Sequence, residues 1–139
     1  MEKWNQSYGF LLGKVLQKME IKFVEGLSPF EINARQYGVL LFIEGNPHCS
    51  QKDISEKLQI DRTTMVSHID HLEGLGYVER TKNPNDRRSY SLLLTAKGKD
   101  VLDSRWEFLT HTESEILAPL SEPEKQLLKE ILIKVWITL

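Results

Sequence analysis

Cysteine is almost missing from this sequence of 139 residues, because Cys49 is the only one. A single cysteine excludes a disulfide within the chain and a zinc site built from several cysteines. We expect Cys49 to be a buried or half-buried, inert thiol. A run of about 18 apolar residues is also missing, which excludes a membrane-spanning helix. The first residues lead into a mixed helical pattern rather than an apolar signal sequence, so a cytoplasmic protein is expected.

The sequence lacks the short motifs of common enzymes. There is no G-x-S-x-G, phosphate-binding loop, H-E-x-x-H or dinucleotide fingerprint, so we expect no catalytic activity and no cofactor. An excess of positive charge is missing as well, because the net charge is −2. This excludes a protein that coats nucleic acid nonspecifically. It does not exclude a local binding face, since charges at cellular salt act over roughly 10 Å or less.

Residues 50–94 have the pattern of two short helices followed by two strands. Ser50 and Asp53 form a capping-box start for the first helix, and Asp61 is a suitable N-cap for the second, which ends at glycines. The strands are expected at 77–81 and 89–94, with turn residues 83–86 between them. This order predicts a winged helix-turn-helix, which places its second helix in the major groove of DNA.

The second helix has an apolar side and a polar side of unusual composition. Met65, Val66, Ile69 and Leu72 recur at helical spacing and are expected to be buried. The opposite side carries short hydroxyls rather than lysine and glutamate, and short side chains allow close approach to base edges. An ordinary solvated amphipathic helix is the alternative. The residues expected to face DNA are Arg62, Thr63, Thr64, Ser67, His68 and His71.

The segment between the two strands is basic. Residues 80–88 contain four basic side chains against Asp86 alone, a local charge of +3 (four minus one) in a chain of net charge −2. We expect Arg88 to enter the minor groove and Asp86 to orient it; for Asp86 an ordinary turn-forming role is the alternative. The expected DNA-binding set is completed by Gln51, Lys82 and Arg87.

Together these residues resemble the MarR family of bacterial transcription regulators. The resemblance lies in the Gln-Lys-Asp, Ile-Asp-Arg-Thr-Thr, Leu-Glu-Gly-Leu-Gly-Tyr-Val-Glu-Arg, Asn-Pro-Asn-Asp-Arg-Arg-Ser and Leu-Thr-Ala-Lys-Gly runs, and covers roughly residues 33–100. It implies a mainly α-helical protein of six helices with a small β-wing. It also implies a homodimer that binds a pseudo-palindromic operator and usually represses, and it leaves open a small aromatic or lipophilic effector.

The flanks of the chain are more apolar than one small lobe requires. Residues 1–32 and 100–139 are expected to form a helical dimerisation region, and residues 33–99 the winged helix-turn-helix domain. The first helix is expected to include Trp4 and end at Gly26, and Ser121 begins a C-terminal helix with a broad apolar face. Packing within one chain is the alternative, but the resemblance favours a homodimer.

Three further interpretations concern ligands and the alternative function. An effector bound where the terminal helices meet the lobe is expected to contact Tyr8, Leu12, Tyr37 and Trp106. The two histidines at 68 and 71 have a possible zinc spacing, but no carboxylate at a fixed helical offset completes the set, so no metal site is expected; some MarR-like proteins sense zinc. The alternative function is a ligand-binding or adaptor module on the same scaffold without DNA-binding activity.

Overall fold

The computed structural model describes residues 2–83 and 86–138, and the side chain of Arg87 also lies outside the described part. Within this part the chain forms six α-helices and one two-stranded antiparallel sheet. The helices are α1 (Tyr8–Leu27), α2 (Ala34–Gly45), α3 (Gln51–Leu58), α4 (Arg62–Gly74), α5 (Ala96–Ile116) and α6 (Glu122–Thr138). The strands are β1 (Val78–Asn83) and β2 (Asp86–Leu94), and two 3-10 turns are η1 (Lys3–Gln6) and η2 (Ser28–Phe30).

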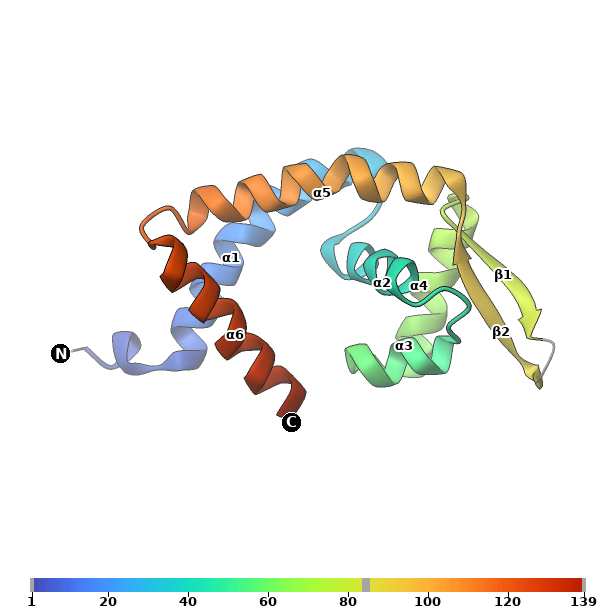
Figure 1. The fold of residues 1–139 in the computed structure, drawn as a ribbon, viewed down its shortest axis with the longest axis horizontal. Coiled ribbons are helices and arrows are strands. Elements are labelled where there is room, and N and C mark those ends of the chain that lie inside the picture. The colour runs from blue at the N-terminus through green and yellow to red at the C-terminus, as the bar shows by residue number, and fades with distance from the viewer. Residues whose placement is uncertain (1, 84–85, 139) are drawn as a thin grey trace.

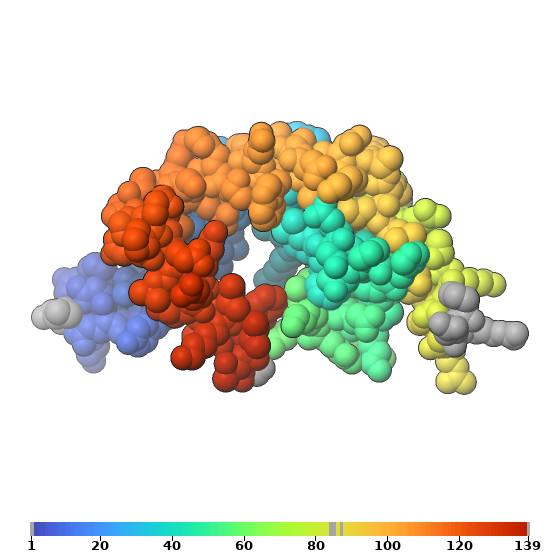
Figure 2. Space-filling view, in the orientation of Figure 1, coloured from blue at the N-terminus to red at the C-terminus, as the bar shows by residue number. Residues whose placement is uncertain are grey.

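The long helix α5 joins two parts of the molecule (Figure 1). One end of α5 carries the winged-helix lobe, made of α2, α3, α4 and the β1–β2 hairpin. The other end lies alongside α1 and leads into α6, and these three helices are called the helical arm below. Figure 2 shows an opening beneath α5, between α6 and the lobe. Helix α6 therefore stands apart from the lobe.

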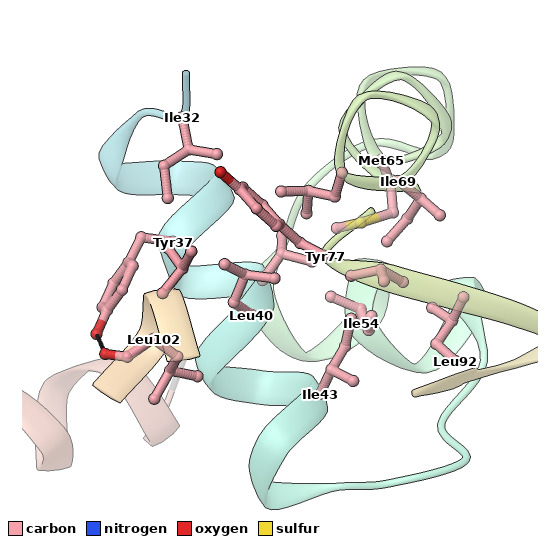
Figure 3. Close-up of a cluster of buried hydrophobic side chains, with 14 of the residues drawn as sticks. Ile32, Tyr37, Leu40, Ile43, Ile54, Met65, Ile69, Tyr77, Leu92 and Leu102 are labelled. Atoms are coloured by element: carbon pink, nitrogen blue, oxygen red, sulfur yellow. Dashed lines mark hydrogen bonds between the residues drawn. The ribbon is translucent and has the colours of Figure 1, made fainter. Parts of the chain in front are cut away.

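The core of the lobe is formed by side chains from all its elements (Figure 3). Leu40, Ile54, Met65, Ile69 and Leu92 are fully buried and come from α2, α3, α4 and β2. At a typical value of about 1.5–3 kcal/mol for each buried side chain of this size, their burial accounts for much of the lobe's stability. The start of α5 closes one side of this core through Leu102.

The helix starts predicted at Ser50, Asp61 and Ser121 are confirmed, and two further helices begin with caps of the same kind. The Asn33 and Ser50 side chains begin α2 and α3 with reciprocal capping boxes to Gln36 and Asp53. The Asp61 and Thr95 side chains cap α4 and α5. Ser121 accepts from the backbone N–H of Glu124 at 3.3 Å, and the Glu124 carboxylate accepts from the Ser121 N–H at 2.9 Å. Caps satisfy the free amides of the first turn, so they locate helix starts without tertiary information.

Three boundaries differ from the sequence-based expectation. Trp4 lies in η1 rather than in α1, because Ser7 interrupts the helix and caps α1 by accepting from the Phe10 N–H at 3.2 Å. Both strands are longer than expected, since antiparallel pairing continues along the hairpin as far as Asn83 and Asp86. Of the predicted turn at 83–86, positions 84 and 85 lie outside the described residues.

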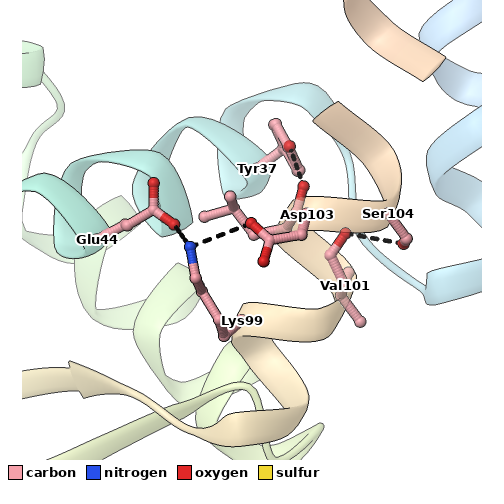
Figure 4. Close-up of polar contacts among 7 residues, drawn as sticks. Tyr37, Glu44, Lys99, Val101, Asp103 and Ser104 are labelled. Atoms are coloured by element: carbon pink, nitrogen blue, oxygen red, sulfur yellow. Dashed lines mark hydrogen bonds and ion pairs between the residues drawn. The ribbon is translucent and has the colours of Figure 1, made fainter. Parts of the chain in front are cut away.

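Polar contacts tie α5 to the lobe (Figure 4). Lys99 on α5 pairs with Glu44 on α2, and its Nζ lies 3.1 Å from Oδ1 of Asp103. The Tyr37 hydroxyl donates to the Leu102 carbonyl at 2.7 Å.

Within the described part of the chain, no helix combines the length and apolar character that crossing a membrane requires.

Gly98 offers a test of how closely α5 packs on the lobe. A Cβ at this position would lie 2.0 Å from the backbone oxygen of Tyr77, so Gly98→Ala is expected to destabilise the protein by about 1–3 kcal/mol. Gly38 is the matched control, because a Cβ there would meet no atom within 4 Å. Gly38→Ala in α2 should be neutral or stabilise by up to about 1 kcal/mol. Urea unfolding of both variants measures the difference, and equal stabilities would contradict the close approach.

Candidate DNA interface

The helix-turn-helix is formed by α3, a short turn and α4. Gln59 ends α3 in the left-handed backbone region at φ 55°, and the Ile60 N–H bonds back to the Ser55 carbonyl at 3.1 Å. Asp61 then caps α4. Met65, Ile69 and Leu72 anchor α4 to the core with no exposed surface, so the helix is fixed with its opposite side toward solvent.

The exposed side of α4 begins with Arg62 and Thr63 and continues with Ser67 one turn later. These three predicted DNA-facing side chains are exposed, as expected. Thr64 is different, because it is half-buried and its hydroxyl donates to Asp61 at 2.6 Å. This bond and the Thr64 backbone N–H lower the pKa of Asp61. Thr64 therefore belongs to the cap of α4 rather than to its open face.

The sequence-based prediction that Val66 is buried is wrong. Its side chain is 43% exposed rather than buried. Val66 lies one turn after Arg62, on the flank of α4 that also carries Asp70 and Glu73, and the core lies on the other side. A periodic pattern gives the centre of a buried arc but not its edges. Val66 thus adds an apolar group to the open face.

The two histidines of α4 differ in position: His68 is half-buried on a flank of the helix, whereas His71 is exposed one turn after Ser67. Nδ1 of His68 lies 3.4 Å from the amide nitrogen of Gln36 at the start of α2. His71 is exposed, but its Nε2 lies 2.6 Å from the Glu31 carbonyl oxygen, just before α2. Both contacts arise because the segment that leads into α2 packs against this part of α4.

The wing is the β1–β2 hairpin, with Val78 opposite Leu94 and Lys82 opposite Tyr90. The segment before α3 adds an isolated bridge between Cys49 and Leu92, which holds the helix-turn-helix against the wing. Lys82 and Tyr90 are exposed. Cys49 is buried, as expected, and burial, followed by the nearby Asp53 carboxylate, raises the pKa of its thiol to about 11. The thiol is therefore protonated and unreactive near neutral pH.

Arg80 has a structural role that its charge alone did not indicate. Its side chain is only 17% exposed and its guanidinium contacts Asp70 at 2.6 Å and Glu73 at 3.3 Å, both on α4. Its Nε also donates to the side-chain oxygen of Gln51 at 3.0 Å. Arg80 thus joins β1, α4 and the start of α3. Gln51, a predicted DNA contact, keeps only its amide N–H groups available, since its oxygen accepts from Arg80.

Asp86 and Arg88, at the wing tip, are exposed to solvent. The Asp86 carboxylate accepts from the backbone N–H of Arg88 at 2.9 Å. Asp86 therefore fixes the backbone that carries Arg88. An ordinary turn-forming aspartate makes the same bond, so both sequence-based interpretations of Asp86 are compatible with it. Arg87 was also a predicted contact, and its side chain lies outside the described part.

The four expected effector contacts are not brought together by the fold. Tyr37 is buried with its hydroxyl bonded to Leu102, and burial raises its pKa to about 12. Tyr8 and Leu12 are exposed on the first turns of α1, and Trp106 is exposed on α5. Two shallow hollows of about 310 and 450 Å³ are lined by other residues. Among the described residues, no three His, Cys, Asp or Glu side chains are grouped as metal ligands.

A capped recognition helix, a preceding helix and a basic two-stranded wing define a winged helix-turn-helix of the kind that binds DNA. Residues 30–89 match the MarR family. The chain is 30% identical to the multiple antibiotic resistance protein MarR of Escherichia coli strain K12, over 91% of this chain and 89% of that protein. It is 28% identical to the HTH-type transcriptional regulator BilQ of Clostridioides difficile strain CD3, over 91% and 86%.

A solved structure of the transcriptional repressor CouR, bound to a 23-mer DNA duplex, superposes on this fold with a TM-score of 0.86. It is 30% identical to this chain and covers 97% of this chain and 96% of its own. The chain belongs to the MarR family of transcription regulators. It is accordingly a DNA-binding regulator of transcription, and its relatives are regulators rather than enzymes.

Proposed function

We propose that this chain is a homodimeric repressor that binds a pseudo-palindromic operator. One α4 from each protomer enters the major groove, and each wing tip enters the adjacent minor groove. The observation that carries this proposal is the open face of α4, where Arg62, Thr63 and Ser67 are exposed; Lys82 and Arg88 are exposed on the wing. Short hydroxyls can approach base edges, and cations can contact phosphates and narrow minor grooves.

The dimer is supported by apolar surface that one chain leaves open. No described residue of α6 is buried, and α1 buries only Gly26 and Leu27. Large exposed side chains on these helices include Leu12, Leu16, Val24, Leu127, Ile131 and Trp136. Many large apolar side chains left exposed on two neighbouring elements mark an interface. Pairing two helical arms would set the distance between two recognition helices, which must lie about 34–36 Å apart to contact successive half-sites.

Repression is supported by the relative CouR, which is described as a transcriptional repressor. A repressor of this type is released when a ligand favours a spacing of the recognition helices that the operator cannot accept. By linkage, such a ligand must bind the DNA complex less tightly than the free dimer. A ligand that binds both forms equally therefore cannot be the effector.

The direct test is selection of duplexes from a random pool by the intact protein, followed by gel shift at controlled salt. We expect a two-fold symmetric sequence bound by two protomers, with affinity that falls steeply as salt rises. Arg62→Ala should weaken specific binding, whereas Lys22→Ala in α1, an exposed residue of the helical arm, should not. Failure to enrich any sequence would favour the ligand-binding or adaptor module instead.

Val66 should contribute to sequence preference through the thymine methyl group, the apolar feature of the major groove. We expect replacement of one contacted thymine by deoxyuridine in each half-site to cost about 0.8 kcal/mol per half-site, the value of one buried methylene-sized group. In the Val66→Ala variant the same replacement should cost nothing, because the methyl has lost its contact. Fluorescence anisotropy on matched duplexes measures both. Equal losses in the two proteins would exclude Val66 as the contact.

A further inference from the structure

His68 lies on the flank of α4 that packs against the start of α2. The residue is half-buried, and its Nε2 atom is shielded from solvent without a hydrogen-bond partner in the described part of the chain. Its other ring nitrogen, Nδ1, lies 3.4 Å from the side-chain amide nitrogen of Gln36. The ring thus touches the capping box of a neighbouring helix.

The orientation of the Gln36 amide is set by that capping box. Its oxygen accepts from the Asn33 N–H at 3.1 Å, while the Asn33 side chain accepts from the Gln36 N–H at 2.8 Å. The NH₂ group of Gln36 therefore faces His68, and an NH₂ group can only donate. Nδ1 must accept, so the single proton of the neutral ring is on Nε2.

The charges around the ring also favour the neutral form. Burial is the largest effect, followed by Arg35 on α2 and His71 on α4, and together they lower the pKa of His68 below its usual value of 6.5. Asp61, the N-cap of α4, acts in the opposite direction. His71 differs from His68, because its Nε2 donates to the Glu31 carbonyl oxygen.

We propose that His68 is a positioning residue that holds α4 on the cap of α2 only while its ring is neutral, so that acidification weakens operator binding. A second ring proton would point from Nδ1 at the NH₂ group of Gln36, placing donor against donor. Gln36 cannot turn its amide without losing the bond to the Asn33 N–H. The recognition helix would then lose an anchor beside the face that meets DNA. This inference rests on the proposed function for its readout.

The direction in which DNA affinity changes with pH distinguishes the His68 contact from general electrostatics. A protonated histidine adds positive charge near DNA, and charge alone would tighten binding as the pH falls. Here the folded state disfavours the charged ring. The stabilising contribution of the neutral contact is complete above the usual histidine pKa and is lost as the pH falls through the lowered value.

The experiment measures affinity for the selected duplex from pH 8 to pH 5 at constant salt. Wild type should lose affinity as the pH falls through the lowered pKa of His68, by at most about tenfold per ring for each pH unit. His68→Asn keeps an acceptor for Gln36 but cannot titrate, so its profile should be flat. Gln36→Glu can still accept from the Asn33 N–H and offers a second carboxylate oxygen to a charged ring. Because the contact then survives protonation of the ring, its loss of affinity at low pH should disappear. His111→Asn, on the exposed side of α5, is the matched control, and its affinity for the duplex should depend on pH in the same way as that of wild type.

Two outcomes would overturn the proposal: wild-type affinity that is flat or rises with acid, or a His68→Asn profile that matches wild type. If His68→Asn does not fold, Gln36→Glu decides alone. If no duplex is bound even at pH 8, the proposed function fails, but the positioning contact remains testable by NMR titration of His68. Gln36→Glu should then raise the His68 pKa, and an unchanged value would refute the contact.

Discussion

Replacing Leu127 and Ile131 of α6 by aspartate is expected to abolish the dimer. These side chains are one turn apart and are 54% and 48% exposed in the single chain. We therefore expect them to be buried in the dimer interface rather than within one protomer. Each contributes about 1.5–3 kcal/mol when buried, and a symmetric dimer buries each residue twice. We expect the free energy of dimerisation to weaken by at least about 4 kcal/mol, because charges would also be buried. Sedimentation at micromolar concentration measures it.

Operator binding should be lost together with the dimer, since a monomer can contact only one half-site. The matched control is the apolar pair Leu127→Met and Ile131→Leu, which conserves volume and should remain dimeric with DNA affinity close to wild type. A wild-type protein that sediments as a folded monomer would contradict the dimer directly. So would an aspartate variant that retains both the dimer and specific DNA binding.

Features that depend on a few consecutive residues were predictable from the sequence. Ser50 and Asp61 were assigned as helix starts because a capping side chain bonds within its own first turn, and the structure has both bonds. The buried centre of α4 was predictable for a similar reason, because Met65, Ile69 and Leu72 share one helical face. Local geometry therefore gave the order of elements that defines the winged helix-turn-helix.

The edges of the interface were not predictable, because they depend on which segment packs beside α4. The start of α2 covers the flank with His68, so this histidine turns away from the open face. Val66, on another flank, is left uncovered. Arg80 was counted with the basic wing, but its partners Asp70 and Glu73 belong to a different element. Only the pairing of β1 with its neighbours shows that this positive charge is neutralised.

Arg88→Ala in the wing tip should weaken operator binding by roughly 1–3 kcal/mol for each wing and reduce the salt dependence by about one unit per wing. Asp86→Ala is the more informative variant. Removing a carboxylate from a basic wing should tighten DNA binding if only net charge matters. We expect weaker binding, because Asp86 accepts from the Arg88 N–H at 2.9 Å and fixes the backbone at the wing tip. Asp86→Asn is the control, since its side-chain oxygen can still accept that bond and should preserve most of the affinity. Gel shifts at two salt concentrations, with circular dichroism to verify the fold, would separate the two effects. An Asp86→Ala protein that binds the operator as tightly as wild type, or more tightly, would reduce the wing to a simple basic patch.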